Sequence, residues 1–456
     1  MYSGGVHTKK NARLIDIHPE GIVEKAFLAG VEVESSESLW STEDSLEELA
    51  ALARTAGAEV VGSLTQRLRT PDVRYYLGKG RTAELAQLQR ELGFDLVIFD
   101  DELSPSQQRN LEAEVNARVI DRTALILDIF AQHAHTREGK LQVELAQLEY
   151  RLPRLSGRGT ALSRVGGGSR GAGGGGTGGG ARAGAIGVRG PGETKLELDR
   201  RRIRKRISDL RHELDGVRRQ RTQQRRERSE QAMPVVSIVG YTNAGKSTLF
   251  NALAQAEVLV ENKLFATLDP TTRHLVLPSH QEILLGDTVG FIQKLPTDLV
   301  AAFRATLEEV SEADLLIEVV DISHENAIEQ SQTVNEVLAE LGASEKPRVT
   351  ALNKIDLLED AAQLDLSLFP NAVPISAIKG RGLDALLAKV GQVVAAEMEP
   401  MRVRIPYEAS QMVELFHRRG RVLRERHTHE GTTIEGSLPQ ALRPLFEPFQ
   451  VPRHNG

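Results

Sequence analysis

The segment G-Y-T-N-A-G-K-S, residues 240–247, constrains the fold of this chain more than any other part of its sequence. The apolar run P-V-V-S-I-V precedes it, and the helix-favouring run T-L-F-N-A-L follows it. A strand, a G-x-x-x-x-G-K-S loop and a helix in that order form a phosphate-binding unit. Lys246 would place its charge on the β and γ oxygens, and the Ser247 hydroxyl would reach Mg²⁺. The loop residues expected to contact the nucleotide are Gly240, Tyr241, Thr242, Asn243, Ala244, Gly245, Lys246 and Ser247.

A second motif, D-T-V-G at 287–290, follows the strand-like run E-I-L-L-G-D. Asp287 would order the ligands of the magnesium ion without binding the ion directly. The Gly290 N–H would face the γ-phosphate. Thr288 and Val289 lie between them and belong to the expected nucleotide site. Alone this motif is a weak signal, but it stands in the expected order after the phosphate loop.

Two more motifs indicate which base is bound. N-K-I-D at 353–356 follows a strand-like run, and S-A-I-K-G follows another at 376–380. The Asp356 carboxylate can accept hydrogen bonds from both N1–H and N2–H of guanine, which adenine does not offer in that arrangement. Asn353 and Lys354 would brace the loop and the base, and Ser376 with the Ala377 N–H would back the guanine O6. Ile355 and Ile378 complete this part of the site. The four motifs together predict a guanine-nucleotide switch.

The first switch segment is expected at K-L-F-A-T-L-D-P-T-T-R, residues 263–273. A threonine there must reach both Mg²⁺ and the γ-phosphate, and spacing alone does not choose among Thr267, Thr271 and Thr272. Phe291 stands where many GTPases have a water-orienting Gln, so intrinsic hydrolysis should be slow. Asn243 would either help to bind a monovalent cation beside the phosphates or only stabilise the loop.

The chain is expected to be α/β in class, with several domains. Residues 1–21 are polar and predict a disordered tail, and 22–135 alternate strand-like and helix-like runs typical of a mostly parallel sheet. A helical hairpin with a glycine-rich loop is expected over 136–232. The GTPase domain, a mostly parallel sheet with helices on both faces, would span 233–398, and a small C-terminal α/β domain 399–456.

Two narrow apolar seams predict the hairpin. Leu141, Leu145, Leu148 and Leu152 form the first, and Ile203, Ile207, Leu210, Leu214 and Val217 form the second. Between them, residues 166–180 contain eleven Gly, too many to order without a partner. From 200 to 228 the chain carries a net charge of +9 although its total is −6. Such a helix favours contact with a nucleic-acid backbone over a merely solvated face.

Composition excludes several classes of protein. The chain has no cysteine, which rules out disulfides, thiolate zinc sites and cysteine nucleophiles. Aromatic residues make up only 4%, which disfavours an aromatic platform for single strands. No apolar run is long enough to span a bilayer, and the N-terminus lacks a signal-peptide core. We therefore expect a cytoplasmic protein without a membrane anchor, and a monomer.

Several segments together resemble one family. They are the run at 121–134, E-G-K-L-Q-V-E-L-A-Q-L-E-Y at 138–150, R-G-P-G-E-T-K-L-E-L-D-R-R at 189–201, the phosphate loop, and F-A-T-L-D-P-T. They closely resemble HflX, a family of ribosome-associated GTPases, over about residues 22–435. The resemblance implies a GTPase that binds the large ribosomal subunit through its N-terminal region. The expected partners are the large subunit and the 70S ribosome, including their ribosomal RNA. Family members split stalled or idle ribosomes, notably under stress, and reset by hydrolysing GTP.

The resemblance also implies roles for single residues. Thr267 in F-A-T-L matches the family's switch threonine, a ligand of Mg²⁺, so the expected catalytic residues are Lys246, Thr267 and Gly290. The neighbouring residues expected to contact the nucleotide are Phe265, Ala266, Leu268 and Asp269.

The same residues are compatible with other functions. An RNA-binding GTPase that assists or checks assembly of the large subunit would need the same residues, so the sequence does not separate it from a splitting factor. The N-K-I-D string argues against an ATP-driven P-loop enzyme. A membrane-acting GTPase is disfavoured because no anchor is evident.

Overall fold

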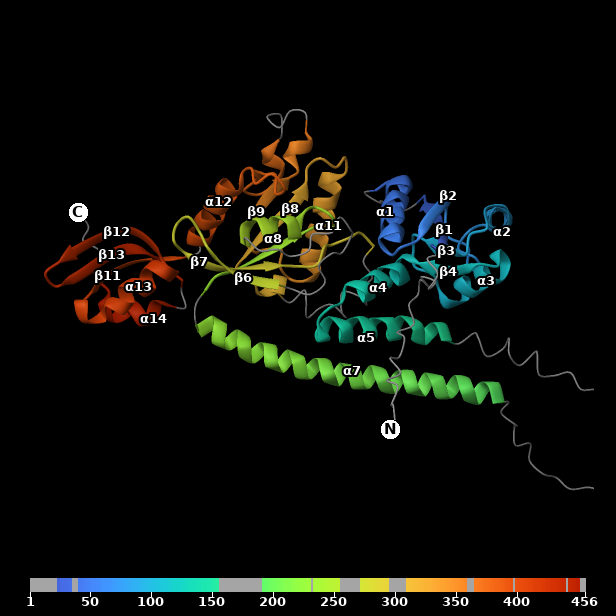
Figure 1. Ribbon diagram of the computed structural model, residues 1–456, viewed down its shortest axis with the longest axis horizontal. Helices are drawn as coiled ribbons and strands as arrows, with labels where there is room; N and C mark the ends of the chain where they lie inside the picture. Colours follow the sequence, from blue (N-terminus) through green and yellow to red (C-terminus); the bar gives the residue numbers. More distant parts are fainter. Residues whose placement is uncertain are drawn as a thin grey trace, which may run out of the picture. The chain divides into compact units, whose positions relative to one another are not determined.

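The computed structural model describes residues 23–34, 40–155, 191–230, 233–254, 271–294, 309–358, 365–396, 398–439 and 442–451 (Figure 1). Two compact units group segments that are separate along the chain. The first unit comprises Met1–Ser36, Ala56–Asp128 and Leu141–Gly216, and the second comprises Glu37–Thr55, Ile129–Lys140 and Val217–Gly456. Helix α1 (Thr42–Thr55) therefore groups with the GTPase segments, although the chain order would place it with the N-terminal strands.

The first unit contains a four-stranded parallel sheet in the order β2-β1-β3-β4. The strands are β1 (Lys25–Val33), β2 (Glu59–Leu68), β3 (Leu96–Phe99) and β4 (Arg118–Asp121), and the helices following them are α2 (Lys79–Leu92), α3 (Pro105–Val115) and α4 (Arg122–His133). Ser104 caps α3: its Oγ accepts from the Gln107 N–H over 3.2 Å, and the Gln107 side chain accepts from the Ser104 N–H over 3.0 Å. This capping box fixes where the helix begins.

The helical hairpin consists of α5 (Arg137–Arg154) and α7 (Pro191–Glu230), whose residues from Leu141 to Gly216 belong to the same unit. Figure 1 draws the two helices side by side and running in opposite directions. Their apolar seams pack into one cluster, in which Leu210 is fully buried. Ion pairs flank the cluster, because Glu144 accepts from Arg206 over 2.7 Å and Glu149 accepts from Arg211 over 2.7 Å. The residues in the cluster are Leu141, Leu145, Leu148, Leu152, Ile203, Ile207, Leu210 and Leu214.

The GTPase segments form a six-stranded sheet in the order β10-β9-β8-β5-β7-β6. Its strands are β5 (Val235–Gly240), β6 (Thr271–Val276), β7 (Glu282–Asp287), β8 (Leu315–Asp321), β9 (Arg348–Asn353) and β10 (Val373–Pro374), and its helices are α8 (Lys246–Ala254), α11 (Ala327–Glu340) and α12 (Leu383–Ala396). Only β6 runs antiparallel to its neighbour. Because β5, β7, β8 and β9 are parallel, their carboxyl ends meet at one edge, where ligands bind in sheets of this kind.

The C-terminal segment forms a three-stranded antiparallel sheet in the order β11-β13-β12. Its elements are β11 (Glu399–Ile405), α13 (Ser410–Arg419), β12 (Arg421–Thr428), β13 (Gly431–Leu438) and α14 (Arg443–Phe446). The rings of Phe416 and Phe446 meet edge to face, 5.4 Å between centroids, in the core that joins helices and sheet. Short 3₁₀ turns lie at η2 (Ile355–Leu357), η4 (Leu366–Leu368), η5 (Tyr407–Ala409) and η7 (Glu447–Phe449).

The predicted fold class is confirmed by these elements, because an N-terminal α/β sheet, a helical hairpin and a mostly parallel GTPase sheet are all present. Within the described ranges, no helix is both long enough and apolar enough to cross a membrane.

Candidate nucleotide site

Two glycines of the phosphate loop sit where no side chain fits. Gly240 has a φ of +146° and Gly245 a φ of +99°. A Cβ on Gly240 would lie 2.3 Å from the carbonyl oxygen of Val319, and one on Gly245 would lie 2.2 Å from Nδ2 of Asn353. The loop therefore packs directly on the ends of β8 and β9, and this close approach requires glycine at both positions.

Lys246, the first residue of α8, is buried under the loop. Its Nζ donates to the Tyr241 carbonyl oxygen over 2.7 Å. Burial lowers the pKa of Lys246 to about 8, while the nearby Asp287 carboxylate acts in the opposite direction. A Cβ on Gly290 would lie 2.9 Å from the same Nζ, so the D-T-V-G segment passes immediately beside the lysine.

The Ser247 hydroxyl and the Asp287 carboxylate lie together at the carboxyl end of β7. Ser247 Oγ donates to Asp287 Oδ2 over 3.0 Å. A hydroxyl and a carboxylate are hard oxygen donors of the kind that Mg²⁺ prefers, so these two residues fit that ion. The next residue, Thr288, is fully buried, and its hydroxyl donates to the Ile238 carbonyl oxygen over 2.6 Å. Val289 is also buried.

Asn353 connects the segments predicted to recognise the base with the phosphate loop. Its Nδ2 donates to the Ala244 carbonyl oxygen over 2.9 Å, and its Oδ1 accepts from the Ala377 N–H over 3.0 Å. One amide side chain therefore connects the phosphate loop, 109 residues earlier in the chain, with the segment at Ala377, 24 residues later. The Ala377 N–H, expected from the sequence to face guanine O6, is used here for this bridge.

Asp356 lies in the turn η2, directly after β9. The Ser376 hydroxyl donates to its Oδ1 over 2.5 Å, and Lys379 Nζ lies 3.5 Å from its Oδ2. The Ser376 hydrogen bond, with a smaller contribution from Lys379, holds the pKa of Asp356 below its usual range. The carboxylate is thus kept ionised and acceptor-only, as recognition of two guanine N–H groups requires.

Lys354 is held by a residue that the sequence did not single out. It adopts the left-handed conformation, with a φ of +67°, and its Nζ donates to Asp321 Oδ2 over 2.6 Å. Asp321 is the last residue of β8, and an acidic residue at the end of an apolar run was the available signal. The pair fixes the position of the Lys354 side chain within the N-K-I-D segment.

Phe291 is part of the framework beneath the phosphate loop. Its side chain is 1% exposed, its N–H donates to the Gly240 carbonyl over 3.0 Å, and its carbonyl accepts from the Thr242 N–H over 2.7 Å. These backbone bonds fasten the segment after D-T-V-G to the loop. The side chain points into the core rather than toward solvent.

Helix α1 contacts the same framework. The Tyr241 hydroxyl donates to Glu48 over 2.6 Å and accepts from the Gln293 N–H over 3.0 Å. Gln293 Nε2 donates to Ser45 Oγ over 3.1 Å, and the Trp40 ring stacks on the Tyr241 ring at 5.8 Å. Sequence reasoning missed these contacts because nothing local marks residues 40–48 as partners of the loop.

Of the remaining predicted residues, some lie within the described ranges and the others lie outside them. Asn243 is exposed, with a left-handed φ of +60°, and Ile378 is 79% exposed. Ile355 begins η2. The switch segment lies partly outside the described residues, including Phe265, Ala266, Thr267, Leu268 and Asp269. Thr271 and Thr272 begin β6, where they pair with Asp287 and Gly286 of β7.

Comparison with known proteins identifies the family. Residues 43–131 match the family described as GTP-binding GTPase N-terminal, 133–228 match GTP-binding GTPase Middle Region, and 235–354 match 50S ribosome-binding GTPase. GTPase HflX of Caldanaerobacter subterraneus is 46% identical over 94% of this chain and 94% of its own length. GTPase HflX of Escherichia coli is 42% identical over 85% of this chain and 88% of its own length.

The chain belongs to the HflX family of GTPases.

As a member of the HflX family, the protein is a GTPase that binds guanine nucleotide. A crystal structure of a GTP-binding protein from Sulfolobus solfataricus in complex with GDP matches 82% of this chain and 99% of that chain. The two share 26% sequence identity at a TM-score of 0.41.

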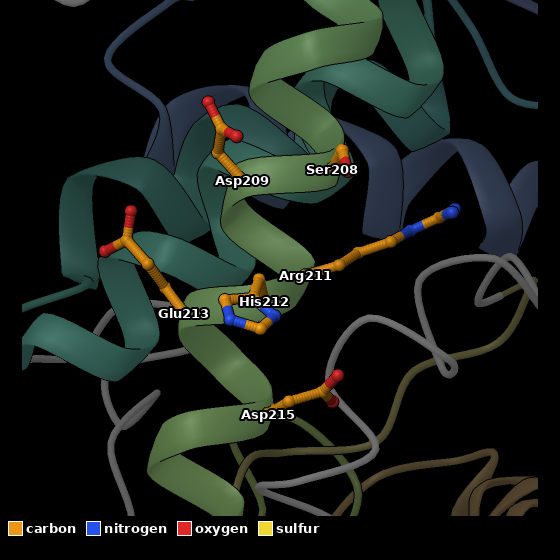
Figure 2. A pocket seen from close by; sticks show the side chains of 6 residues that line it. All are labelled: Ser208, Asp209, Arg211, His212, Glu213 and Asp215. Atoms are coloured by element: carbon orange, nitrogen blue, oxygen red, sulfur yellow. The ribbon is translucent and has the colours of Figure 1, made fainter.

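A surface depression on α7 of this HflX-family chain is not a comparable site (Figure 2). All of the side chains around it come from one stretch of a single helix, and Figure 2 shows them pointing to different sides of that helix. A ligand site needs groups that converge from several elements. The lining residues are Ser208, Asp209, Arg211, His212, Glu213 and Asp215.

Proposed function

We propose that this chain is a magnesium-dependent GTP switch that binds the large ribosomal subunit and splits stalled or idle 70S ribosomes. The observation that supports it most is the Asn353 bridge between the phosphate loop and the segments proposed to recognise guanine. The loop and Asn353 lie within the match to a 50S ribosome-binding GTPase. The partner would be recognised through ribosomal RNA.

In this proposal the magnesium ion is held by Ser247 and Thr267, with Asp287 ordering its coordination shell. The 3.0 Å contact between Ser247 and Asp287 supports that arrangement. The ion would neutralise charge on the β and γ phosphates. Lys246 would share that task, and the Gly290 N–H would face the γ-phosphate from beside it.

Asp356 would recognise guanine through N1–H and N2–H, because its carboxylate is kept ionised by Ser376. Lys354, positioned by Asp321, would brace the base. Of the two roles predicted for Asn243, we propose the contact to a monovalent cation, and comparing hydrolysis in different monovalent salts at equal ionic strength tests it.

The residues after D-T-V-G support the proposal that the ribosome stimulates hydrolysis. Phe291 is buried and carries no polar atom that could orient water. Gln293, the nearest glutamine after the motif, is 8% exposed and its amide donates to Ser45. Among the described residues of this segment, neither side chain is placed to activate water. The group that orients the attacking water would therefore come from the ribosome.

Ribosomal RNA would be bound by the basic part of α7. Arg201, Arg202 and Arg204 are exposed on this helix, whereas Arg206 pairs with Glu144. Several exposed arginines on one stretch can neutralise phosphates and release counterions. Salt-dependent ribosome binding is the expected consequence.

Sucrose-gradient profiles of purified 70S ribosomes test the proposed activity. Adding the protein with GTP should reduce the 70S peak and raise both subunit peaks, whereas Lys246→Ala should leave the profile unchanged. A 70S peak that persists while the protein co-migrates with large subunits would favour the alternative, a GTPase that assists or checks subunit assembly.

A further inference from the structure

One face of the C-terminal sheet is covered and the other is open. Helices α13 and α14 pack on the covered face, where Val403, Ile405 and Ile434 are fully buried (Figure 1). Along β13, buried residues alternate with half-buried ones, as expected for a sheet with one solvated face. Thr433, Glu435 and Ser437 are the half-buried residues and therefore define the open face.

The registers of the neighbouring strands place arginines beside these three residues. On β11, Arg404 pairs with Thr433 and Arg402 with Glu435. On β12, Arg426 pairs with Thr433, Arg424 with Glu435 and Arg421 with Ser437. Residues directly opposite each other in an antiparallel pair point to the same side of the sheet. Five arginines therefore share the open face.

A β-bulge makes this arrangement possible. The register of β12 against β13 shifts between Val422 and Arg424, which leaves Leu423 as the extra residue. Strict alternation would have put Arg421 on the opposite face from Arg424, because side chains alternate with a period of two. The inserted residue restores Arg421 to the open face, and Leu423 itself is 61% exposed at the edge.

Most of this charge is not neutralised within the protein. Arg402 Nε lies 3.1 Å from Glu435 Oε1, and Arg404 Nη1 lies 2.6 Å from Glu430 Oε2. Within the part of the chain that the structure describes, no carboxylate lies within ion-pair distance of the exposed Arg421, Arg424 or Arg426. These three exposed guanidinium groups share one face of the edge strand β12 and form a local positive field in a chain of net charge −6.

We propose that this open face, defined by Arg402, Arg404, Arg421, Arg424 and Arg426, binds the phosphodiester backbone of RNA. The guanidinium fork matches phosphate geometry. No aromatic residue stands at the paired positions of this face, so it contacts the backbone and does not stack bases. The proposal goes beyond the proposed function, which places RNA contact on α7, and concerns a domain beyond residue 354, where the three family matches end.

A binding experiment on the full chain tests it. A fluorescein-labelled RNA hairpin of about 16 base pairs, the span that a double-stranded RNA-binding domain covers, serves as the probe, and anisotropy is read at several KCl concentrations. Arg424→Gln/Arg426→Gln should weaken binding several-fold at low salt. It should also reduce the slope of log affinity against log salt by about 1–2, since each phosphate contact contributes a little under one.

A matched control removes two charges from the helical side of the same domain. Arg418→Gln/Arg443→Gln alters exposed arginines that pair with Glu414 and Glu399 and should leave the slope near the wild-type value. Because α7 is intact in both variants, its contribution to RNA binding cancels. A second variant, Arg421→Gln/Arg424→Gln, should reproduce the loss, and circular dichroism melts confirm that each variant is folded.

Two results would overturn the proposal. One is an equal slope in the open-face variants and in the control. The other is unchanged RNA binding together with lost binding of polyglutamate, which would assign the face to an acidic protein. Neither result depends on ribosome splitting or GTP turnover, so the proposed function is judged separately.

Discussion

The hydroxyl group of Tyr241 donates a 2.6 Å hydrogen bond to Glu48, and so joins the phosphate loop to helix α1. The same hydroxyl accepts from the N–H of Gln293, two residues after Phe291. One oxygen atom thus connects the loop that would surround the phosphates, the segment after D-T-V-G, and a helix that lies nearly 200 residues earlier in the chain. The stability of the loop therefore depends on α1.

Replacing Tyr241 with Phe removes this connection while keeping the ring that stacks on Trp40. We expect the free energy of unfolding to fall by about 1–3 kcal/mol, since a hydrogen bond to a charged group is lost and the Gln293 N–H loses its acceptor. Urea unfolding followed by the fluorescence of Trp40, the only tryptophan, measures it. Tyr407→Phe, which removes an exposed hydroxyl bonded to Thr428, is the control, and an equal small effect in both variants would contradict the account.

Asp356→Asn should change the base that the protein prefers. An amide presents a donor where the carboxylate presents an acceptor, so the guanine N2–H group loses its partner and a xanthine oxygen gains one. Competition between GDP and XDP for binding should shift toward XDP by at least about tenfold. Asp365→Asn is a control, because Asp365 likewise accepts a hydrogen bond from a nearby serine, Ser367, yet is exposed and lies outside the site. Unchanged preference in Asp356→Asn would refute the guanine assignment.

Gly245→Ala should damage the bridge between the loop and Asn353. The new Cβ would lie 2.2 Å from Nδ2 of Asn353, and the φ of +99° would be strained with any side chain. GDP affinity, measured by calorimetry, should fall at least about tenfold, equivalent to about 1.4 kcal/mol. Gly342→Ala places a methyl group at a φ of +67° with no atom within 4 Å, so it separates backbone strain from the clash. Equal GDP affinity in Gly245→Ala and wild type would contradict the observed packing.

The pH dependence of stability tests the burial of Lys246. Its pKa is about 8 in the folded protein and about 10.4 in an unfolded chain. Below pH 8 both states hold the proton, so this group adds no slope there. Between about pH 8 and 10.4 the unfolded state binds more protons, so stability should rise with pH by up to about 3 kcal/mol.

The measurement is the free energy of unfolding without nucleotide, from pH 7 to 10, in wild type and in Lys246→Met. The difference between them should grow in favour of wild type as the pH rises above 8, because the methionine variant has no proton to lose. Lys389→Met on α12 removes a lysine away from the loop and controls for general effects of charge. Parallel curves for wild type and Lys246→Met would show that the lysine is not buried as described.

The sequence was informative where chemistry demands fixed local spacing. The strand, loop and helix around Lys246 could be predicted because phosphate binding requires glycines and a lysine at set positions in one turn. Leucine seams such as that of Leu141 and Leu145 predicted the helical hairpin because helical periodicity is local. The family resemblance was confirmed by relatives over most of the chain.

Features created by tertiary packing could not be predicted in the same way. Glu48 reaches Tyr241 only because α1 groups with the GTPase segments, and no pattern near residue 48 signals that. The Ala377 N–H donates to Asn353, where the sequence suggested a direct role at the base. The bulge at Leu423 is a matter of hydrogen-bond register, which a run of alternating residues does not reveal. Thr267 lies outside the described residues, so its role as a magnesium ligand stays a prediction.

We propose above all that the ribosome supplies the group that orients the attacking water, because neither Phe291 nor Gln293 is placed to do so. The most direct measurement is the rate of GTP hydrolysis at fixed Mg²⁺, with and without purified large ribosomal subunits, using Lys246→Ala as the blank. We expect a slow basal rate and a stimulation of about 10²-fold or more, the contribution of one positioned catalytic group. A measurable basal rate that large subunits leave unchanged would contradict this proposal, and would detach the GTPase from the ribosome.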